Sequence, residues 1–165
     1  MSTLPHLNQA GEAHMVDVSA KEATFRRAVA RGMVRMGEAA IQLLQQNALP
    51  KGDALAVARI AGIMAAKKTA DLLPLCHPLS LSHVELRLSI TGQGVEVEAE
   101  AAVQGATGIE MEVLTAVSIA GLALYDMIKS VDRNACITDI RLIEKAGGRS
   151  GHYVRSEVSN AEKQS

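Results

Sequence analysis

The chain has 165 residues, of which 48% are apolar and only 2% aromatic, and its net charge is −1. The length favours one domain, and the apolar content is enough for a core built from aliphatic side chains. The scarcity of aromatic residues excludes a platform that stacks single-stranded nucleic acid, and the near-neutral charge excludes a broad basic field for nucleic acid or membranes. Any anion site must therefore be local.

The cysteine content and the apolar runs indicate the compartment. Cys76 and Cys136 are too few for a disulfide framework. Residues 1–17 hold no apolar signal segment, and the longest apolar run, residues 113–125, is shorter than a span of roughly 20 residues. We therefore expect a cytoplasmic protein with no membrane partner and no nucleic-acid partner.

The first half of the chain is predicted to contain an arm, a strand and two helices, over residues 1–20, 24–36, 38–46 and 53–68. The arm shows no sustained periodicity and is expected to be flexible. Alternating apolar residues predict the strand. Asp53 is a good N-cap for the second helix. The 3.6-residue period of Ile60, Ile63 and Met64 predicts that these three face inward.

The second half is predicted to contain a hairpin, a long helix and a last strand, over residues 81–91, 95–103, 107–129 and 136–143. In the hairpin, Glu96, Glu98 and Glu100 alternate with Val and Ala, which predicts one acidic, solvated face. The spacing of Thr107 and Glu110 fits a capping box at the start of the long helix. Residues 147–165 are expected to form a flexible Gly-rich tail, which leaves residues 21–146 as the folded domain.

The order of these elements, βαββαβ, predicts an α+β fold of the ferredoxin-like type, a four-stranded antiparallel sheet with helices on one face. The other face would be open in a single copy. Because apolar residues occur on both faces of the predicted strands, we expect a second subunit to cover that open face.

Two prolines enclose a thiol and an imidazole. Pro74 and Pro78 stiffen the backbone around Cys76 and His77. Such a segment can present both polar groups to a ligand. It can equally be a rigid loop in which Cys76 packs as a small hydrophobe and His77 caps a neighbouring group, and the residues alone leave both interpretations open.

Acids occur at both ends of one stripe of the predicted long helix. The helix dipole favours Glu110 and Glu112 in the first turn. It disfavours Asp126 near the C-terminal end, and Lys129 three residues later offsets only part of that cost. Asp126 is therefore a candidate functional acid.

Several cations are candidate anion ligands. Lys51 precedes a helix N-cap, where free N–H groups suit a phosphate, and Lys67 follows the predicted inward stripe toward a pocket rim. For either lysine taken alone, an exposed surface cation is the favoured explanation. Residues 147–151 with Arg149 suit an anion-binding nest or a loose tail. The His and Cys positions show no zinc spacing, so no metal site is expected.

Seven strings, in order along residues 4–154, carry a resemblance to a known family: GEAHMVDV (11–18), KGD (51–53), ARIAGI (58–63), AKKTADLLPLCHPL (66–79), TGIEME (107–112), YDMIK (125–129) and GGRSG (147–151). Together they resemble the MoaC family of molybdenum cofactor biosynthesis. The resemblance implies a ferredoxin-like fold in a hexamer, a trimer of dimers with sites at subunit contacts. It also implies a lyase step that converts 3′,8-cyclo-7,8-dihydroguanosine triphosphate to cyclic pyranopterin monophosphate and releases pyrophosphate.

The matching motifs imply roles for particular residues. The implied catalytic residues are Asp126, Lys51 and Lys129. The implied substrate-binding residues are Leu75, Cys76, His77, Met111 and Glu112, with Glu110, Lys67, Arg26 and Lys145 as further phosphate or purine contacts. No resident cofactor and no metal are expected, and whether a divalent cation accompanies the substrate triphosphate stays open.

Two other functions stay open at this point. A small domain of this fold can be a non-catalytic nucleotide sensor or a subunit-association module. A sensor has no need for an acid such as Asp126 at a helix C-terminus. A phosphate-cleaving enzyme acting on another nucleotide would normally need metal-binding carboxylates.

Overall fold

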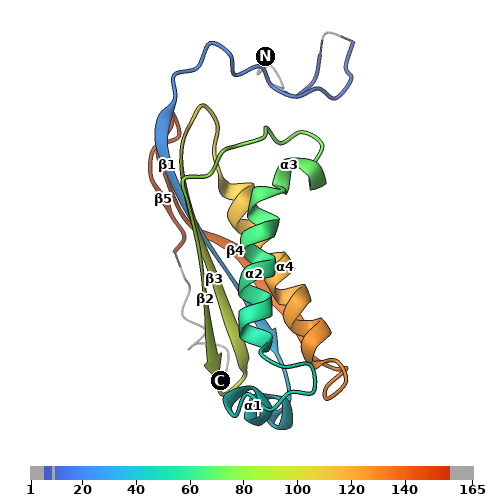
Figure 1. Cartoon of the computed structure of the whole chain (residues 1–165). Coiled ribbons are helices and arrows are strands. Elements are labelled where there is room, and N and C mark those ends of the chain that lie inside the picture. Colours follow the sequence, from blue (N-terminus) through green and yellow to red (C-terminus); the bar gives the residue numbers. More distant parts are fainter. Residues whose placement is uncertain (1–5, 9, 157–165) are drawn as a thin grey trace, which may run out of the picture.

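A sheet and a layer of helices make up the part of the chain that the computed structural model describes, residues 6–8 and 10–156. Helices α2 and α4 lie together on one side of the sheet (Figure 1). The elements are β1 (Thr24–Arg35), α1 (Glu38–Gln45), α2 (Ala54–Lys67), α3 (Thr69–Leu72), β2 (His83–Thr91), β3 (Gly94–Gly105), α4 (Glu110–Ile128), β4 (Cys136–Ala146) and β5 (Tyr153–Val154).

The sheet has the strand order β2-β3-β1-β4-β5, and every neighbouring pair is antiparallel. The prediction of an α+β fold with an antiparallel sheet is thereby confirmed. The prediction of four strands is wrong, because β5 comes from the segment assigned to the tail. Gly147 and Gly148 have positive φ values of 96° and 75°, which let the chain turn back so that Tyr153 pairs with Lys145 of β4.

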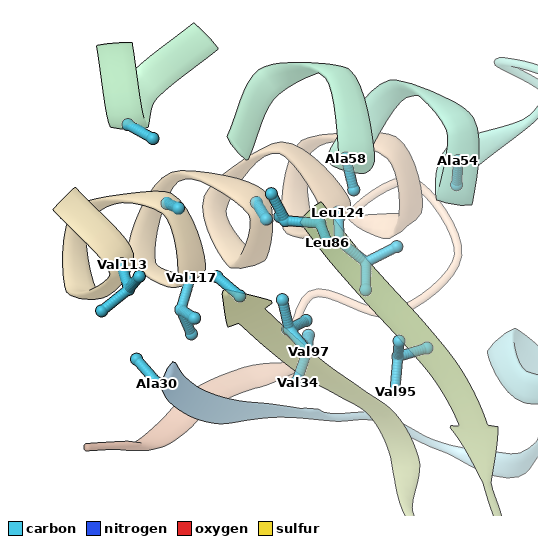
Figure 2. Packing of buried hydrophobic residues seen from close by; sticks show 14 of the residues in the cluster. Ala30, Val34, Ala54, Ala58, Leu86, Val95, Val97, Val113, Val117 and Leu124 are labelled. Atoms are coloured by element: carbon cyan, nitrogen blue, oxygen red, sulfur yellow. The ribbon is translucent and has the colours of Figure 1, made fainter. Parts of the chain in front are cut away.

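The core fills the space between the inner face of the sheet and the two long helices (Figure 2). Val34, Val97, Val113 and Leu124 are all at most 1% exposed. With one phenylalanine and no tryptophan in the chain, the core is aliphatic as predicted. Burying these side chains contributes about 1.5–3 kcal/mol each.

The inner face of α2 differs from the prediction. Ile60 and Met64 are 59% and 54% exposed, whereas Ala58 and Gly62 face inward. A Cβ at Gly62 would lie 2.2 Å from Leu86 Cδ2 and 3.0 Å from the carbonyl oxygen of Ala116. The helices approach so closely that only small side chains fit between them, and Ile60 and Met64 therefore point outward. Ile63, the third residue of the predicted inward stripe, is partly buried against the core.

Ion pairs cover the outer face of the sheet. Arg31 Nε lies 2.6 Å from Glu98 Oε2, and Arg27 reaches Glu100 at 2.7 Å and Glu144 at 3.0 Å. The predicted acidic face of the hairpin is therefore neutralised by arginines of β1. Phe25, Val29 and Met33 lie on the same face of β1 as these arginines, so the expectation that a second subunit covers apolar residues there stays a prediction.

Helix α4 begins later than its predicted capping box. Its N-cap is Ile109, which makes no side-chain capping bond, so the prediction that Thr107 caps the helix is wrong. The Glu110 carboxylate instead lies over Gly108, where a Cβ would be 2.0 Å from Oε2. By length and composition α4 could cross a membrane, but half of its most apolar stretch is buried in the domain, as is usual for the core helix of a folded domain.

Candidate active site

A hollow of about 420 Å³ lies at the N-terminal end of α4. Its wall is built from the Pro-flanked loop after α3, the first turn of α4, the start of β1, the end of β4 and part of the N-terminal segment. Eight of the predicted substrate-binding residues line it: Arg26, Leu75, Cys76, His77, Glu110, Met111, Glu112 and Lys145. Lys67 is not among the lining residues; it is exposed at the last turn of α2, on the outward side with Met64.

The Pro-flanked loop holds His77 against the N-terminal segment. The Cys76 N–H donates to the carbonyl oxygen of Leu73 (3.1 Å), which turns the chain after α3. The imidazole N–H at Nε2 of His77 donates to the carbonyl oxygen of Val16 (2.7 Å). The histidine therefore binds the backbone of the distant N-terminal segment, and it also borders a ligand-sized hollow.

The N-terminal segment supplies lining residues that no residue pattern indicated. Val16, Val18 and Lys21 border the hollow. Residues 1–5 and 9 of the predicted arm lie outside the described residues, and the described part of the arm contains an isolated bridge between Leu7 and Ala13. The string GEAHMVDV, which contributes to the family resemblance, was the one signal that could have pointed to this segment.

Glu112 lines the hollow and is buried. Its side chain belongs to a residue only 3% exposed, and its Oε2 atom has no hydrogen-bond partner in the described protein. Burial, with a smaller contribution from the charge of Glu110, raises the pKa of Glu112 to about 7. Burial and the charge of Glu112 also raise the pKa of the Cys76 thiol. The helix dipole, which favours an acid in the first turn, therefore does not by itself explain why this carboxyl group is buried and has a raised pKa.

A second, basic hollow of about 760 Å³ adjoins the first and shares Lys21, Arg26 and Ser150 with it. Arg149 lines it from the Gly-rich segment. Arg26 is held by the carbonyl oxygens of Gly105 (2.9 Å) and Ala106 (3.2 Å). Gly148 lies against this guanidinium, and its φ of 75° is a conformation that favours glycine. Fixed cations beside backbone with positive φ suit phosphate oxygens.

Lys145 connects the two hollows. Its ammonium donates to the Ser150 hydroxyl and lies 3.6 Å from Glu110 Oε1. The lysine is half-buried, and these contacts hold its ammonium group at a fixed position beside the hollow. An anionic ligand that displaced Glu110 would meet this cation directly.

The three predicted catalytic residues form one cluster at the other end of α4. Lys51 Nζ lies 2.9 Å from Asp126 Oδ2, and Lys129 Nζ lies 2.6 Å from Asp126 Oδ1. Hydrogen bonds from Lys129 and then Lys51 lower the pKa of Asp126 to about 2, and the pKa of Lys129 is raised by the same carboxylate. Gly52, with φ of 92°, makes the turn that brings Lys51 to the helix end.

These two groups of predicted residues lie at opposite ends of α4, which runs along the sheet (Figure 1). Glu112 and Asp126 are fourteen positions apart on α4, a separation of roughly 21 Å at 1.5 Å per residue. Within one chain the cluster of Asp126, Lys51 and Lys129 and the hollow are therefore separate. Within residues 6–8 and 10–156, no three His, Cys, Asp or Glu side chains are grouped so that they could hold a metal ion.

The structure is an α+β protein with a ligand-sized hollow at one end of α4 and an acid paired with two lysines at the other. The model of the MoaC family matches residues 15–148, and the chain belongs to this family. Similar proteins named cyclic pyranopterin monophosphate synthase occur in Roseiflexus sp. (strain RS-1), at 56% identity over 93% of this chain and 99% of the relative, and in Heliobacterium modesticaldum, at 53% identity over 95% and 100%. A third, in Streptomyces coelicolor, is 54% identical over 93% of this chain and 90% of the relative. The family that the sequence motifs indicated is confirmed.

Proposed function

We propose that this protein is a cyclic pyranopterin monophosphate synthase of molybdenum cofactor biosynthesis. It converts (8S)-3′,8-cyclo-7,8-dihydroguanosine 5′-triphosphate to cyclic pyranopterin monophosphate and releases pyrophosphate. The names of the full-length relatives support the activity. The observation that carries the proposal on chemical grounds is the cluster in which one exposed carboxylate, Asp126, holds both Lys51 and Lys129.

The residue types match the chemical steps. Opening a purine-derived ring and closing a pyran require protons to be taken up and delivered at several atoms, which an acid in contact with two amines performs. Release of pyrophosphate requires cations against the charge that develops on the leaving oxygen. The second hollow, with Lys21, Arg26 and Arg149, offers those cations.

We propose further that the protein is a homo-oligomer, a hexamer built as a trimer of dimers, and that each active site combines the hollow of one chain with the catalytic cluster of another. The separation of the hollow from the cluster of Asp126, Lys51 and Lys129 within one chain supports this proposal. The outward side of the helical layer also carries a stripe of exposed apolar residues, Val57, Ile60 and Met64. Antiparallel pairing of two such layers would bring the end of α4 with Glu112 near the end with Asp126 of a second copy.

The remaining expectations enter as parts of this proposal. The protein would act in the cytoplasm without a resident cofactor or metal, with a divalent cation arriving on the substrate triphosphate if one is used, and without a membrane or nucleic-acid partner. The order β2-β3-β1-β4 supports a ferredoxin-like arrangement that β5 extends. Residues 1–20, 21–146 and 147–165 are proposed as arm, catalytic domain and tail, the last contributing β5 to the sheet.

The test is a turnover assay on the purified protein with the cyclised triphosphate as substrate. We expect one pyrophosphate for each cyclic pyranopterin monophosphate, measured by coupled phosphate detection and by mass spectrometry. Asp126→Asn should abolish both products, whereas Glu38→Gln, which changes an exposed acid on α1, should not. Binding of the substrate by the wild-type protein with neither product formed would contradict the proposal and favour a nucleotide sensor.

A further inference from the structure

Lys51 needs a fixed backbone if its ammonium is to stay on Asp126. The side chain is long, flexible and exposed, so packing alone does not hold it in one place. Its Nζ atom nevertheless donates to both the carboxylate and the backbone carbonyl oxygen of Asp126, each at 2.9 Å. The segment from which Lys51 extends must therefore place it.

Lys51 belongs to a tight turn that precedes α2. The N–H of Gly52 donates to the carbonyl oxygen of Leu49 at 3.0 Å, so that Pro50 and Lys51 are the two central residues. Proline is favoured at the first central position of such a turn, and glycine is favoured at its last position. Gly52 also has a φ of 92°, which favours glycine, and open space where a Cβ would lie. These residue types give Lys51 a defined backbone.

Asp53 closes this turn on the side of the helix. Its carboxylate accepts from the N–H of Ala56 at 2.9 Å, and its carbonyl oxygen accepts from the N–H of Val57 at 3.1 Å. Asp53 is therefore the N-cap of α2. Because the first N–H groups of a helix have no partner within the helix, removal of this carboxylate would loosen the point at which the turn joins α2.

The turn is exposed between two buried residues. Leu49 and Ala54 are 6% and 2% exposed and belong to the core, whereas residues 50–53 are all exposed (Figure 2 labels Ala54). The geometry of residues 50–53 therefore depends on the hydrogen bonds of the turn and of the cap. Among the described residues Asp53 forms no ion pair with Lys51, so its effect on the lysine passes through the backbone.

We propose that Asp53 is a positioning residue for the reaction: by capping α2 it fixes the turn that holds Lys51 against Asp126. This inference rests on the proposed function, because it requires Lys51 to act in the reaction. Asp53 lines neither hollow, so it acts through the lysine. A displacement of about 1 Å at a reacting group can lower a rate roughly 100-fold, so loss of the cap should appear in kcat.

The first measurement is turnover of the cyclised triphosphate by full-length variants. Asp53→Ala should lower kcat roughly 10- to 100-fold. Asp53→Asn should keep most of the activity, because asparagine caps a helix about as well as aspartate. The double variant Lys51→Ala/Asp53→Ala should match Lys51→Ala within about twofold, because Asp53 has nothing left to position once the lysine side chain is absent.

The second measurement does not depend on activity. Lysines are acetylated with a limiting amount of an N-hydroxysuccinimide ester, and mass spectrometry gives the labelling of each. The bonds from Lys51 to Asp126 must break before the nitrogen reacts, so Lys51 should react more slowly than Lys68, an exposed lysine at the end of α2. Asp53→Ala should raise the labelling of Lys51 severalfold and leave that of Lys68 unchanged. Asp53→Asn should keep the wild-type value.

Two further variants separate positioning from stability. Gly52→Ala strains the turn without a clash, so it should reproduce both effects of Asp53→Ala. Val97→Ala removes volume from the core at β3 and is the control for lost stability. Assayed below its melting temperature, Val97→Ala should keep the kcat and the Lys51 labelling of wild type. Melting curves show which variants fold.

Four results would overturn the inference. Equal labelling of Lys51 in wild type, Asp53→Ala and Gly52→Ala would mean that the turn does not hold the lysine. Multiplied losses in the double variant would mean that Asp53 acts apart from Lys51. Equal losses in Asp53→Ala and Asp53→Asn would assign the effect to charge rather than to the cap. Failure of both Asp53→Ala and Gly52→Ala to fold would make the turn purely structural.

Failure of the proposed function is distinguishable from failure of this inference. If the wild-type protein forms no product, the proposed activity is wrong, and the labelling of Lys51 still decides whether the turn holds it. Product formation by wild type with a normal kcat in Asp53→Ala defeats the positioning role alone.

Discussion

The ammonium of Lys51 lies 2.9 Å from the carboxylate of Asp126 and also 2.9 Å from the backbone carbonyl oxygen of the same residue. The lysine comes from the loop before α2, so it fixes the C-terminal end of α4 from outside the helix. Lys129, from the helix itself, holds the other carboxylate oxygen. One acid therefore orients two amines that belong to separate parts of the chain.

Replacing either lysine of this cluster should remove activity and leave the fold intact. We expect Lys51→Ala and Lys129→Ala to reduce turnover at least roughly 100-fold, the usual contribution of a general acid or base. Both lysines are exposed, and exposed ion pairs contribute little to stability, so the melting temperature should stay within about 2 °C of wild type. Arg35→Ala, which breaks an exposed ion pair on β1, is the matched control for both measurements. A large drop in melting temperature would assign the lysines a structural role instead.

Asp126→Asn should bind substrate and fail to convert it. The pKa of the carboxylate is lowered to about 2, so its ion pairs are complete above the reference pKa of 3.8 and are lost only as the pH falls toward 2. The difference in melting temperature between variant and wild type should therefore be constant between pH 5 and pH 8. Calorimetry for binding and mass spectrometry for product check the prediction, and normal product formation by the variant would remove Asp126 from the mechanism.

Two inactive variants should restore activity when mixed. If each active site takes Glu112 from one chain and Asp126 from another, a mixed oligomer of Glu112→Ala and Asp126→Ala contains some sites with both residues intact. We expect partial recovery of turnover after the subunits are unfolded together and refolded. Native mass spectrometry confirms that mixed oligomers have formed. Full mixing without recovered turnover would place the whole site within one chain.

Glu112 should make the protein less stable as the pH rises. Its folded-state pKa of about 7 exceeds the reference value of 4.5, so the folded protein holds a proton that the unfolded chain has lost between these two values. Stability then falls from about pH 4.5 to about pH 7, by an amount on the order of 3 kcal/mol at most. The melting temperature of Glu112→Gln should accordingly rise relative to that of wild type between pH 5 and pH 8. The difference between Glu38→Gln and wild type should stay constant over the same range. If the melting temperatures of wild type and Glu112→Gln change in parallel with pH, Glu112 is not buried in its protonated state.

Gly62→Ala should destabilise the protein although alanine is the better helix former. The added Cβ would meet Leu86 Cδ2 at 2.2 Å and backbone oxygen of Ala116 at 3.0 Å. Overpacking of this kind costs about 1–3 kcal/mol, which outweighs the gain in helix propensity of about 1 kcal/mol at its upper end. Urea unfolding measures the difference. Gly92→Ala is the control, because a Cβ there meets nothing within 4 Å, and equal effects at both positions would argue against the close helix contact.

The strands were predictable where alternation was long. The twelve residues of β1 and of β3 alternate over most of their length, and the turn at Gly94 was visible as a glycine between two apolar runs. The two residues of β5 carry no detectable period. Their pairing depends on the turn at Gly147 and Gly148, which the sequence left equally consistent with a loose tail.

The helix faces and the state of the acids were harder to predict. Hydrophobicity assigned Ile60 and Met64 to the interior, but the contact between α2 and α4 is set by the space that Gly62 leaves free. The motifs implied a substrate-binding role for Glu112, and the structure places this residue on the wall of the hollow. Its burial could not be predicted, because it depends on the Pro-flanked loop and the end of β4 packing over the first turn of α4.

The length of α4 limits which sequence changes the protein can accept during evolution. One inserted residue in the middle of the helix would turn everything beyond it by 100° and shift it by 1.5 Å. Leu124 would then leave the interior, and Asp126 would point away from Lys51. Exposed positions such as Leu122 can exchange their side chains without this effect. During evolution, α4 should therefore accept substitutions at exposed positions far more readily than insertions or deletions.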